Sequence, residues 1–137
     1  NANLDGDSTS TDSESIFSGG RDGNNVPYVP EHVFSGGIDY AYGPFTFGIN
    51  VTHHSETHGT AAETDTEVSG STPDARAGKI DSATLLNLRG GYEINKNYSI
   101  TAGVNNATDL EYISSRHPDG ARAGKPLTAW VKGIASF

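Results

Sequence analysis

The chain of 137 residues contains no cysteine, so neither a disulfide framework nor a thiolate metal site is available to it. No run of about 18 apolar residues occurs, which excludes a membrane-spanning helix. Basic residues are also scarce, with 9 against 17 acidic ones and a net charge of −8. No basic stripe is left to meet phosphates, so nucleic acid is excluded as a partner. The length fits a single domain.

Residues 45–54 carry the pattern around which the chain is organised. Every second residue is apolar, namely Phe45, Phe47, Ile49 and Val51. A period of two predicts an extended strand, because successive side chains leave a pleated backbone on opposite faces. The turn Gly43-Pro44 joins this strand to residues 32–42, which alternate in the same way, so the two segments predict a β-hairpin.

The same alternation predicts three more strands, at residues 80–94, 98–106 and 127–137. The connections alternate in length, with short ones at 43–44 and 95–97 and long ones at 55–78 and 107–125. In an up-and-down meander, both short turns then lie at one end of the sheet and both long loops at the other. The predicted fold is therefore all-β, an antiparallel up-and-down meander of about five strands.

Aromatic residues mark the short-turn end of this predicted sheet. In each strand the apolar-face residue nearest that end is aromatic, which gives the set Tyr42, Phe45, Tyr92, Tyr98 and Phe137. A ring of aromatics at one level is typical of strands that cross a membrane–water interface. Strands of about 9–11 residues also have the length that a tilted strand needs to cross a bilayer.

Two readings of the sheet remain open. A soluble antiparallel sandwich also alternates, and it would make the chain a secreted binding module for cations or glycans. The polar faces favour a membrane barrel, because they carry mostly Gly, Ser, Thr and Asn rather than Lys and Glu. An open sheet cannot span a membrane, because the polar backbone groups at its edges would be unpaired in lipid. If the sheet belongs to a membrane barrel, this chain is therefore part of a larger barrel.

No metal, cofactor or catalytic site is expected. Asp5-Gly6-Asp7 resembles the start of a calcium loop, but Ser10 stands where the turn glycine should be. His53, His54 and His58 are the only cluster of histidines. His53 and His54 are neighbours on a strand and point to opposite faces, so we expect no zinc site here. No nucleophile elbow or other catalytic arrangement is present, and we expect the chain not to be an enzyme.

The run Asn105-Asn106-Ala107-Thr108-Asp109-Leu110-Glu111-Tyr112 resembles the penultimate-strand motif of TonB-dependent outer-membrane receptors. Segments 26–32, 77–80 and 115–120 fit the same family in order, and Phe137 resembles the C-terminal aromatic of outer-membrane barrels. The resemblance extends from about residue 24 to the end, and the most similar subtype is the ferric dicitrate type of siderophore receptor.

The resemblance implies a 22-stranded barrel in the bacterial outer membrane, with an N-terminal plug that this chain lacks. Residues 1–137 would be the C-terminal part of such a barrel, with a loop or disordered lead-in at 1–25 and strands and loops at 26–137. The implied partners are a ferric siderophore or ferric citrate, the outer-membrane lipid, and the TonB complex through the missing N-terminal part.

The implied ligand is a negatively charged iron chelate, which directs attention to the basic residues near the long loops. Arginine grips carboxylates with a planar fork, so Arg116 and Arg122, with Arg76 as third choice, are the candidate ligand contacts. The alternative is that these arginines pair with nearby carboxylates such as Asp119. A second charged group, Asp39, Arg89, Glu93 and Lys132, is expected to stabilise the polar face of the sheet.

Overall fold

The chain folds into two compact units, each assembled from segments that are far apart in the sequence. The computed structural model describes residues 2–12, 14–69 and 72–136. The loop unit comprises Asn1–Val33, His54–Ala83 and Tyr112–Gly124, and the sheet unit comprises Phe34–His53, Thr84–Glu111 and Lys125–Phe137. Within the described ranges, no helix is long and apolar enough to cross a membrane.

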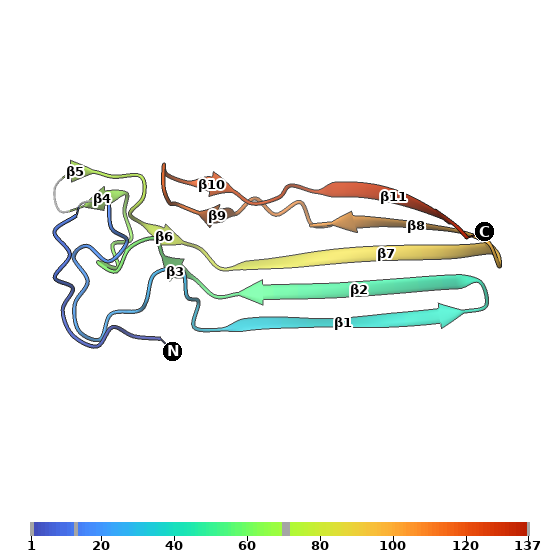
Figure 1. Ribbon diagram of the computed structural model, residues 1–137, viewed down its shortest axis with the longest axis horizontal. Helices are drawn as coiled ribbons and strands as arrows, with labels where there is room; N and C mark the ends of the chain where they lie inside the picture. Colours follow the sequence, from blue (N-terminus) through green and yellow to red (C-terminus); the bar gives the residue numbers. More distant parts are fainter. Residues whose placement is uncertain (1, 13, 70–71, 137) are drawn as a thin grey trace. The chain divides into compact units, whose positions relative to one another are not determined.

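The sheet unit is built on one five-stranded sheet, whose strands follow one another in the order β1-β2-β7-β8-β11 (Figure 1). The strands are β1 (Val33–Tyr42), β2 (Phe45–His54), β7 (Ala83–Asn95), β8 (Tyr98–Asn105) and β11 (Thr128–Ala135). Each strand lies beside the next one of the meander, which confirms the predicted antiparallel fold. The two hairpins turn at residues 43–44 and 96–97, as their Gly-Pro and Asn-Lys-Asn turns predict.

The strand register places the apolar residues on one face. Leu88 pairs with Val104, and Tyr92 pairs with Ile100, and directly opposed residues share a face. The ring of Phe45 lies 4.9 Å from that of Tyr92, so the apolar side of β2 lies on the same face. The apolar residues of β2, β7 and β8 therefore lie on one face of the sheet.

This apolar face is exposed over most of its area. Ile38 is 77% exposed, Val131 70% and Phe47 54%, values far above those of a buried core. A soluble sandwich would cover such a face with a second sheet, whereas the described residues form one large sheet and three short two-stranded pairs. A contiguous apolar surface of this kind suits contact with lipid.

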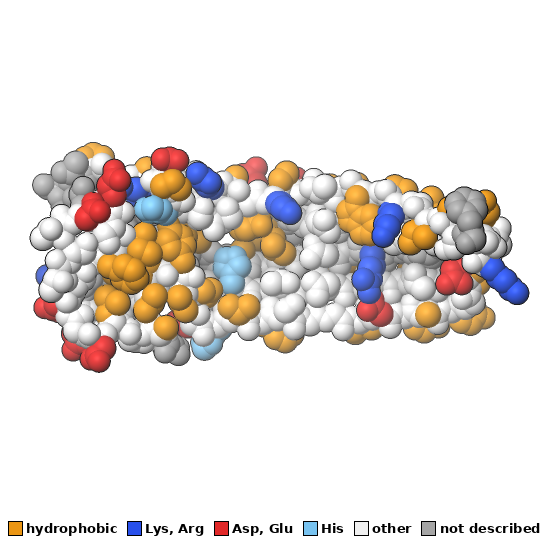
Figure 2. All heavy atoms as spheres, viewed as in Figure 1, with side chains coloured by type: hydrophobic (Ala, Val, Ile, Leu, Met, Phe, Trp, Pro, Cys, Tyr) orange, Lys and Arg blue, Asp and Glu red, His pale blue; other side chains and the backbone are white. Residues whose placement is uncertain are grey.

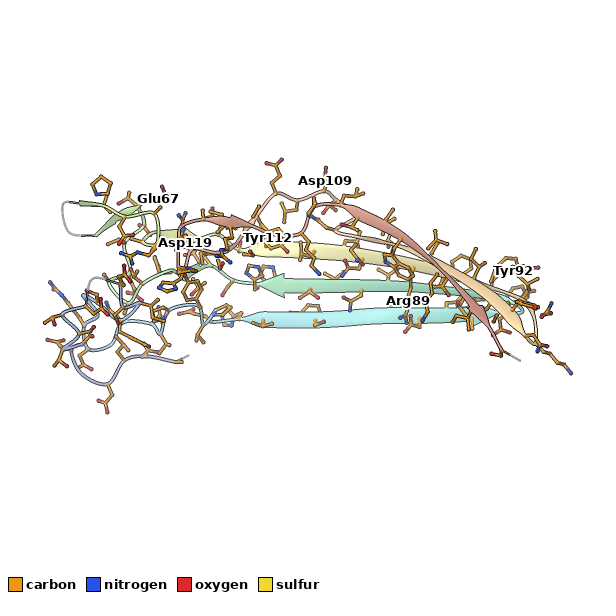
Figure 3. The ribbon with its side chains drawn as sticks, turned by 45° about the horizontal axis from the view of Figure 1, so that its top comes forward. Glu67, Arg89, Tyr92, Asp109, Tyr112 and Asp119 are labelled. Atoms are coloured by element: carbon orange, nitrogen blue, oxygen red, sulfur yellow. The ribbon has the colours of Figure 1, made fainter. Side chains whose placement is uncertain are left out.

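The aromatic residues cluster at the short-turn end of the sheet. Tyr42 ends β1, Phe45 begins β2 and Tyr98 begins β8. Tyr92, which Figure 3 labels, lies three residues before the end of β7. The fifth member of the predicted set, Phe137, lies outside the described residues. The four described aromatics are therefore at one end of the sheet, as a ring at a membrane interface requires.

The loop unit contains three short antiparallel pairs. These are β3 (Thr57–His58) with β6 (Lys79–Ile80), β4 (Val68–Ser69) with β5 (Thr72–Pro73), and β9 (Ile113–Ser115) with β10 (Arg122–Ala123). Residues 2–25 form a loop closed by an antiparallel bridge between Asn3 and Asn25. The buried apolar residues of the described chain gather in this unit, and they are Ala61, Ala77, Ile80 and Ala83.

The predicted start of the third strand, at Ile80, was wrong. Ile80 belongs to β6 and pairs with Thr57. Asp81 and Ser82 lie outside any strand, and β7 begins at Ala83. The side chain of Ile80 is 3% exposed, so burial within the loop unit decides its place.

Candidate functional site

Arg116 is the most buried of the three candidate ligand contacts, with only 7% of its surface exposed. Two glycines of the loop unit make room for its side chain. A Cβ on Gly78 would lie 3.3 Å from Arg116 Cζ, and a Cβ on Gly59 would lie 3.4 Å from its Cβ and Cδ. Gly78 also has φ +107°, a conformation that other residues rarely adopt. The arginine therefore lies in a slot shaped for it.

Two nitrogens of the Arg116 guanidinium group, Nη1 and Nε, have acceptors in this slot. Nη1 donates to Glu67 Oε1 at 2.6 Å and to the carbonyl of Ala75 at 3.5 Å, and Nε donates to the carbonyl of Lys79 at 3.0 Å. The backbone N–H of Arg116 donates to the Tyr28 hydroxyl at 3.3 Å. A buried charge requires such partners, because an unsatisfied guanidinium out of water costs several kcal/mol.

Arg76 lies on the turn that follows β5 and forms a two-point contact with Asp74. Nε donates to Asp74 Oδ1 at 3.0 Å, and Nη2 donates to Oδ2 at 3.1 Å. The hydrogen bonds from Arg76 lower the pKa of the Asp74 carboxyl below its ordinary value of 3.8. Nearby, Lys79 Nζ lies 2.6 Å from Glu56 Oε2, and this hydrogen bond raises the pKa of Lys79.

Arg122 is the most exposed of the three arginines. Its side chain is 57% exposed, and Nη2 lies 3.5 Å from Asp119 Oδ2, the carboxylate that the sequence singled out as a competing partner. Figure 3 labels Asp119 together with Glu67, the carboxylate paired with Arg116. Each of the three arginines thus has a carboxylate partner, and Arg122 has the weakest contact with the largest exposure.

The polar face of the sheet carries the second charged group. Arg89 Nη2 on β7 donates to Asp39 Oδ1 on β1 at 2.6 Å, which spans the intervening strand β2. A Cβ on Gly48 of β2 would lie only 2.4 Å from Arg89 Nε, so a larger residue there would displace the ion pair. In Figure 2 the visible face over the long strands is mostly white, with a few blue and red side chains that adjoin one another.

Trp130 of β11 lies on the same face as Arg89. Arg89 and Trp130 both pair with Gly103, so the three residues form one row across the sheet. A Cβ on Gly103 would approach the Trp130 ring to 2.5 Å. Beside this row is an open hollow of about 320 Å³, whose polar lining includes Asn50 and Asn87.

The asparagine motif after β8 closes the sheet unit. Asn106 is 3% exposed and has φ +50°. Its Nδ2 donates to the carbonyls of Leu110 and Lys125 at 2.9 and 3.1 Å, and its Oδ1 accepts from Leu110 N at 3.0 Å. Asp109 Oδ1 then accepts from Leu127 N at 3.1 Å. The motif therefore has a structural role, because it fastens the end of β8 to the start of β11.

The histidines take part in separate contacts. His53 Nδ1 lies 2.8 Å from Thr84 Oγ1, and His58 Nε2 lies 3.2 Å from Asp65 Oδ1. In the part of the chain that the structure describes, no three His, Asp or Glu side chains gather as a metal site would require.

Comparisons with known proteins extend these observations. The family model described as "TonB dependent receptor-like, beta-barrel" matches residues 2–107. The solved ferric citrate transporter FecA, in its unliganded form, is 30% identical with a TM-score of 0.75, over 84% of this chain and 18% of that chain. The ferric-catecholate import receptor Fiu from E. coli K12 is 22% identical, with a TM-score of 0.67 over 82% of this chain and 15% of that one.

A third similar structure is the siderophore receptor PiuA from Acinetobacter baumannii, 20% identical with a TM-score of 0.66. It is matched over 82% of this chain and 14% of its own length. The chain thus spans less than a fifth of the length of the solved proteins that it resembles.

Proposed function

The chain belongs to the TonB-dependent receptor-like β-barrel family, and on that premise we propose that it is part of the barrel wall of a receptor that imports a ferric chelate. It is a protein of the bacterial outer membrane, and its sheet is a segment of a transmembrane β-barrel. Residues 1–137 form the C-terminal part of that barrel in this proposal. Residues 26–137 supply five strands and their loops, and residues 1–25 form a loop that leads into them.

One similarity carries the choice of ligand class. The protein FecA, described as a ferric citrate transporter, is 30% identical to this chain over 84% of its residues. Ferric citrate and related siderophore complexes are anionic chelates, so we assign the same class of ligand to the receptor of which this chain is part. The receptor acts in uptake rather than catalysis, and it draws on the TonB complex through segments outside this chain.

The candidate contacts are the arginines of the loop unit, and their exposure ranks them. Arg122 has a side chain 57% exposed and a contact of 3.5 Å with Asp119, so a carboxylate of the ligand can replace that partner at little cost. Arg76 is more tightly held by Asp74, at 3.0 Å. Arg116 completes the set, but its 7% exposure favours a role behind the other two.

Binding of ferric citrate to the full-length receptor tests the proposal. Replacing Arg116 and Arg122 together by Ala is expected to weaken binding by about tenfold or more, because charge-assisted hydrogen bonds to a carboxylate are strong. The matched control is Arg21→Ala, which removes an exposed arginine of the same unit. Unchanged affinity in the double variant would remove these arginines from the site and leave the membrane assignment standing.

A further inference from the structure

Contact with a ligand does not explain why Arg116 is buried. We infer that Arg116 is a positioning residue, which fixes the hairpin that carries Arg122 and the turn that carries Arg76. This inference deepens the proposed function and rests on it, because it concerns the same arginine site.

The side chain of Arg116 ties together segments that are distant in the sequence. Its guanidinium donates to Glu67 and to the carbonyls of Ala75 and Lys79, and the backbone N–H of the same residue donates to the hydroxyl of Tyr28. These partners lie from 37 to 88 residues away along the chain. All of them belong to the loop unit. The side chain of Arg116 therefore holds Glu67, Ala75 and Lys79 beside the residues that follow β9, and its backbone N–H adds Tyr28.

The backbone of Arg116 transmits this anchoring to Arg122. Arg116 follows directly after β9, and its carbonyl accepts a hydrogen bond from Gly120 N at 2.9 Å, which closes the turn between β9 and β10. Ser115 at the end of β9 pairs with Arg122 at the start of β10. Fixing Arg116 in its slot thus fixes where the exposed guanidinium of Arg122 is presented.

Arg76 is held by the same slot from the other side. Arg116 Nη1 contacts the carbonyl of Ala75, the neighbour of Arg76, at 3.5 Å. The carbonyl of Arg76 lies so close to Gly59 that a Cβ there would approach it to 2.4 Å. The backbone of Ala75 and Arg76 therefore forms part of the wall of this slot.

An arginine is required for this task. A planar guanidinium offers several donors in a fixed fork, so it can bind a carboxylate and two carbonyls at once. A lysine keeps the charge and can reach Glu67, but its point charge cannot reproduce the fork. Glutamine removes the charge and leaves Glu67 without its cation.

Trypsin cleavage and chelate binding in the full-length receptor together test the inference. The variants are Arg116→Gln, Arg116→Lys, Arg122→Ala, the double variant Arg116→Gln with Arg122→Ala, and Arg21→Gln as the charge-matched control. Cleavage after Arg122 and after Arg76 is followed by mass spectrometry in the folded receptor. Ferric citrate affinity is measured on the same preparations.

We expect Arg116→Gln to speed cleavage after Arg122 and Arg76 by about tenfold or more, Arg116→Lys to restore part of the protection, and Arg21→Gln to match the wild type. Binding should weaken in Arg116→Gln, and the loss of affinity in the double variant should be smaller than the product of the two single losses, because Arg116 acts in part through Arg122. Where Arg116→Gln does not assemble, Arg116→Lys carries both measurements.

Two results would overturn the inference. One is a cleavage rate in the Arg116 variants equal to that of the wild type. The other is a double variant whose loss of affinity is the product of the two single losses, since independent contacts add in free energy. If Arg122→Ala leaves binding unchanged, the ligand assignment in the proposed function fails, and the cleavage rates alone then decide the positioning role.

Discussion

Among single residues, the pair of Asp74 and Arg76 gives the loop unit a dependence on pH. The hydrogen bonds from Arg76 hold the pKa of Asp74 below 3.8, so the folded state keeps this carboxylate ionised more readily than the unfolded state does. A lowered pKa contributes stability that is present above the ordinary pKa and lost as the pH falls through the lower folded value.

Asp74→Asn removes that contribution at neutral pH. We expect residues 73–80 to exchange amide hydrogens faster in this variant than in the wild type at pH 6–7, after correction for intrinsic rates. The difference should shrink below about pH 4 and vanish once the wild-type carboxyl is protonated. A difference that persists or grows in acid would show that the ion pair does not stabilise this turn.

Asn106 is the residue on which the end of β8 most depends. Replacing it by Ala leaves the carbonyls of Leu110 and Lys125 and the N–H of Leu110 without their partner. It also places an alanine at φ +50°. We expect a loss of about 2–4 kcal/mol in the free energy of unfolding, measured for the full-length receptor in lipid bilayers with urea.

The neighbouring Asn105→Ala serves as the control for this prediction. Asn105 is exposed on the polar face, so its replacement should change the free energy of unfolding by about 0.5 kcal/mol or less. Equal effects of the two substitutions would mean that the bonds of Asn106 do not fasten β8 to β11.

At the scale of the strand, β2 separates lipid-facing from inward-facing positions. Ile49 lies near the middle of its apolar side, so Ile49→Lys is expected to cost about 2–4 kcal/mol in a bilayer. A lysine at the aromatic end, in Phe45→Lys, lies near the membrane interface, so its position in the bilayer should lower the free energy of unfolding by only about 0–1 kcal/mol. The loss of the ring contact between Phe45 and Tyr92 is a separate cost.

Asn50→Lys is the matched control on the opposite face of β2. It lies beside Ile49 at the same depth, but its side chain belongs to the polar face, where a lysine stays hydrated. The free energy of unfolding is measured for all three variants in lipid bilayers. A cost for Asn50→Lys equal to that for Ile49→Lys would contradict the assignment of the two faces.

The long strands could be predicted from the sequence because each follows a period of two, least regularly in β11, where Trp130 and Ile134 fall among the polar positions. The bounds of the first hairpin, 32–42 and 45–54, agree with β1 and β2 to within one residue. The short strands of the loop unit were missed, because runs of two or three residues have no measurable period. Ile80 was misplaced for a related reason, since its burial in the loop unit is a tertiary effect.

The candidate site was less predictable than the fold. The sequence singled out Arg116, Arg122 and Arg76 by their charge and their place in the long loops. It also identified Asp119 as the competing partner of Arg122. The burial of Arg116 could not be predicted, because the nearest hydrogen-bond partner of its side chain along the chain, the carbonyl of Lys79, is 37 residues away. Composition and local spacing do not report contacts of that range.

In the whole molecule, the sheet has one apolar side, which we propose faces lipid, and one polar side. Three observations support this arrangement. They are the alternation along the long strands, the exposure of the apolar face and the aromatic cluster at one end of the sheet. The polar side carries the Asp39–Arg89 pair beside Gly48 and the Trp130 ring beside Gly103.

Accessibility along β2 in the full-length receptor tests this arrangement most directly. The chain itself has no cysteine, so single cysteines carrying a spin label can be placed at positions 46 to 51 in a cysteine-free background. In bilayers, labels at Phe47→Cys, Ile49→Cys and Val51→Cys should collide readily with oxygen and poorly with a water-soluble nickel complex. Labels at Thr46→Cys and Asn50→Cys should show the reverse. Equal accessibility to both reagents at odd and even positions would contradict a membrane-spanning wall.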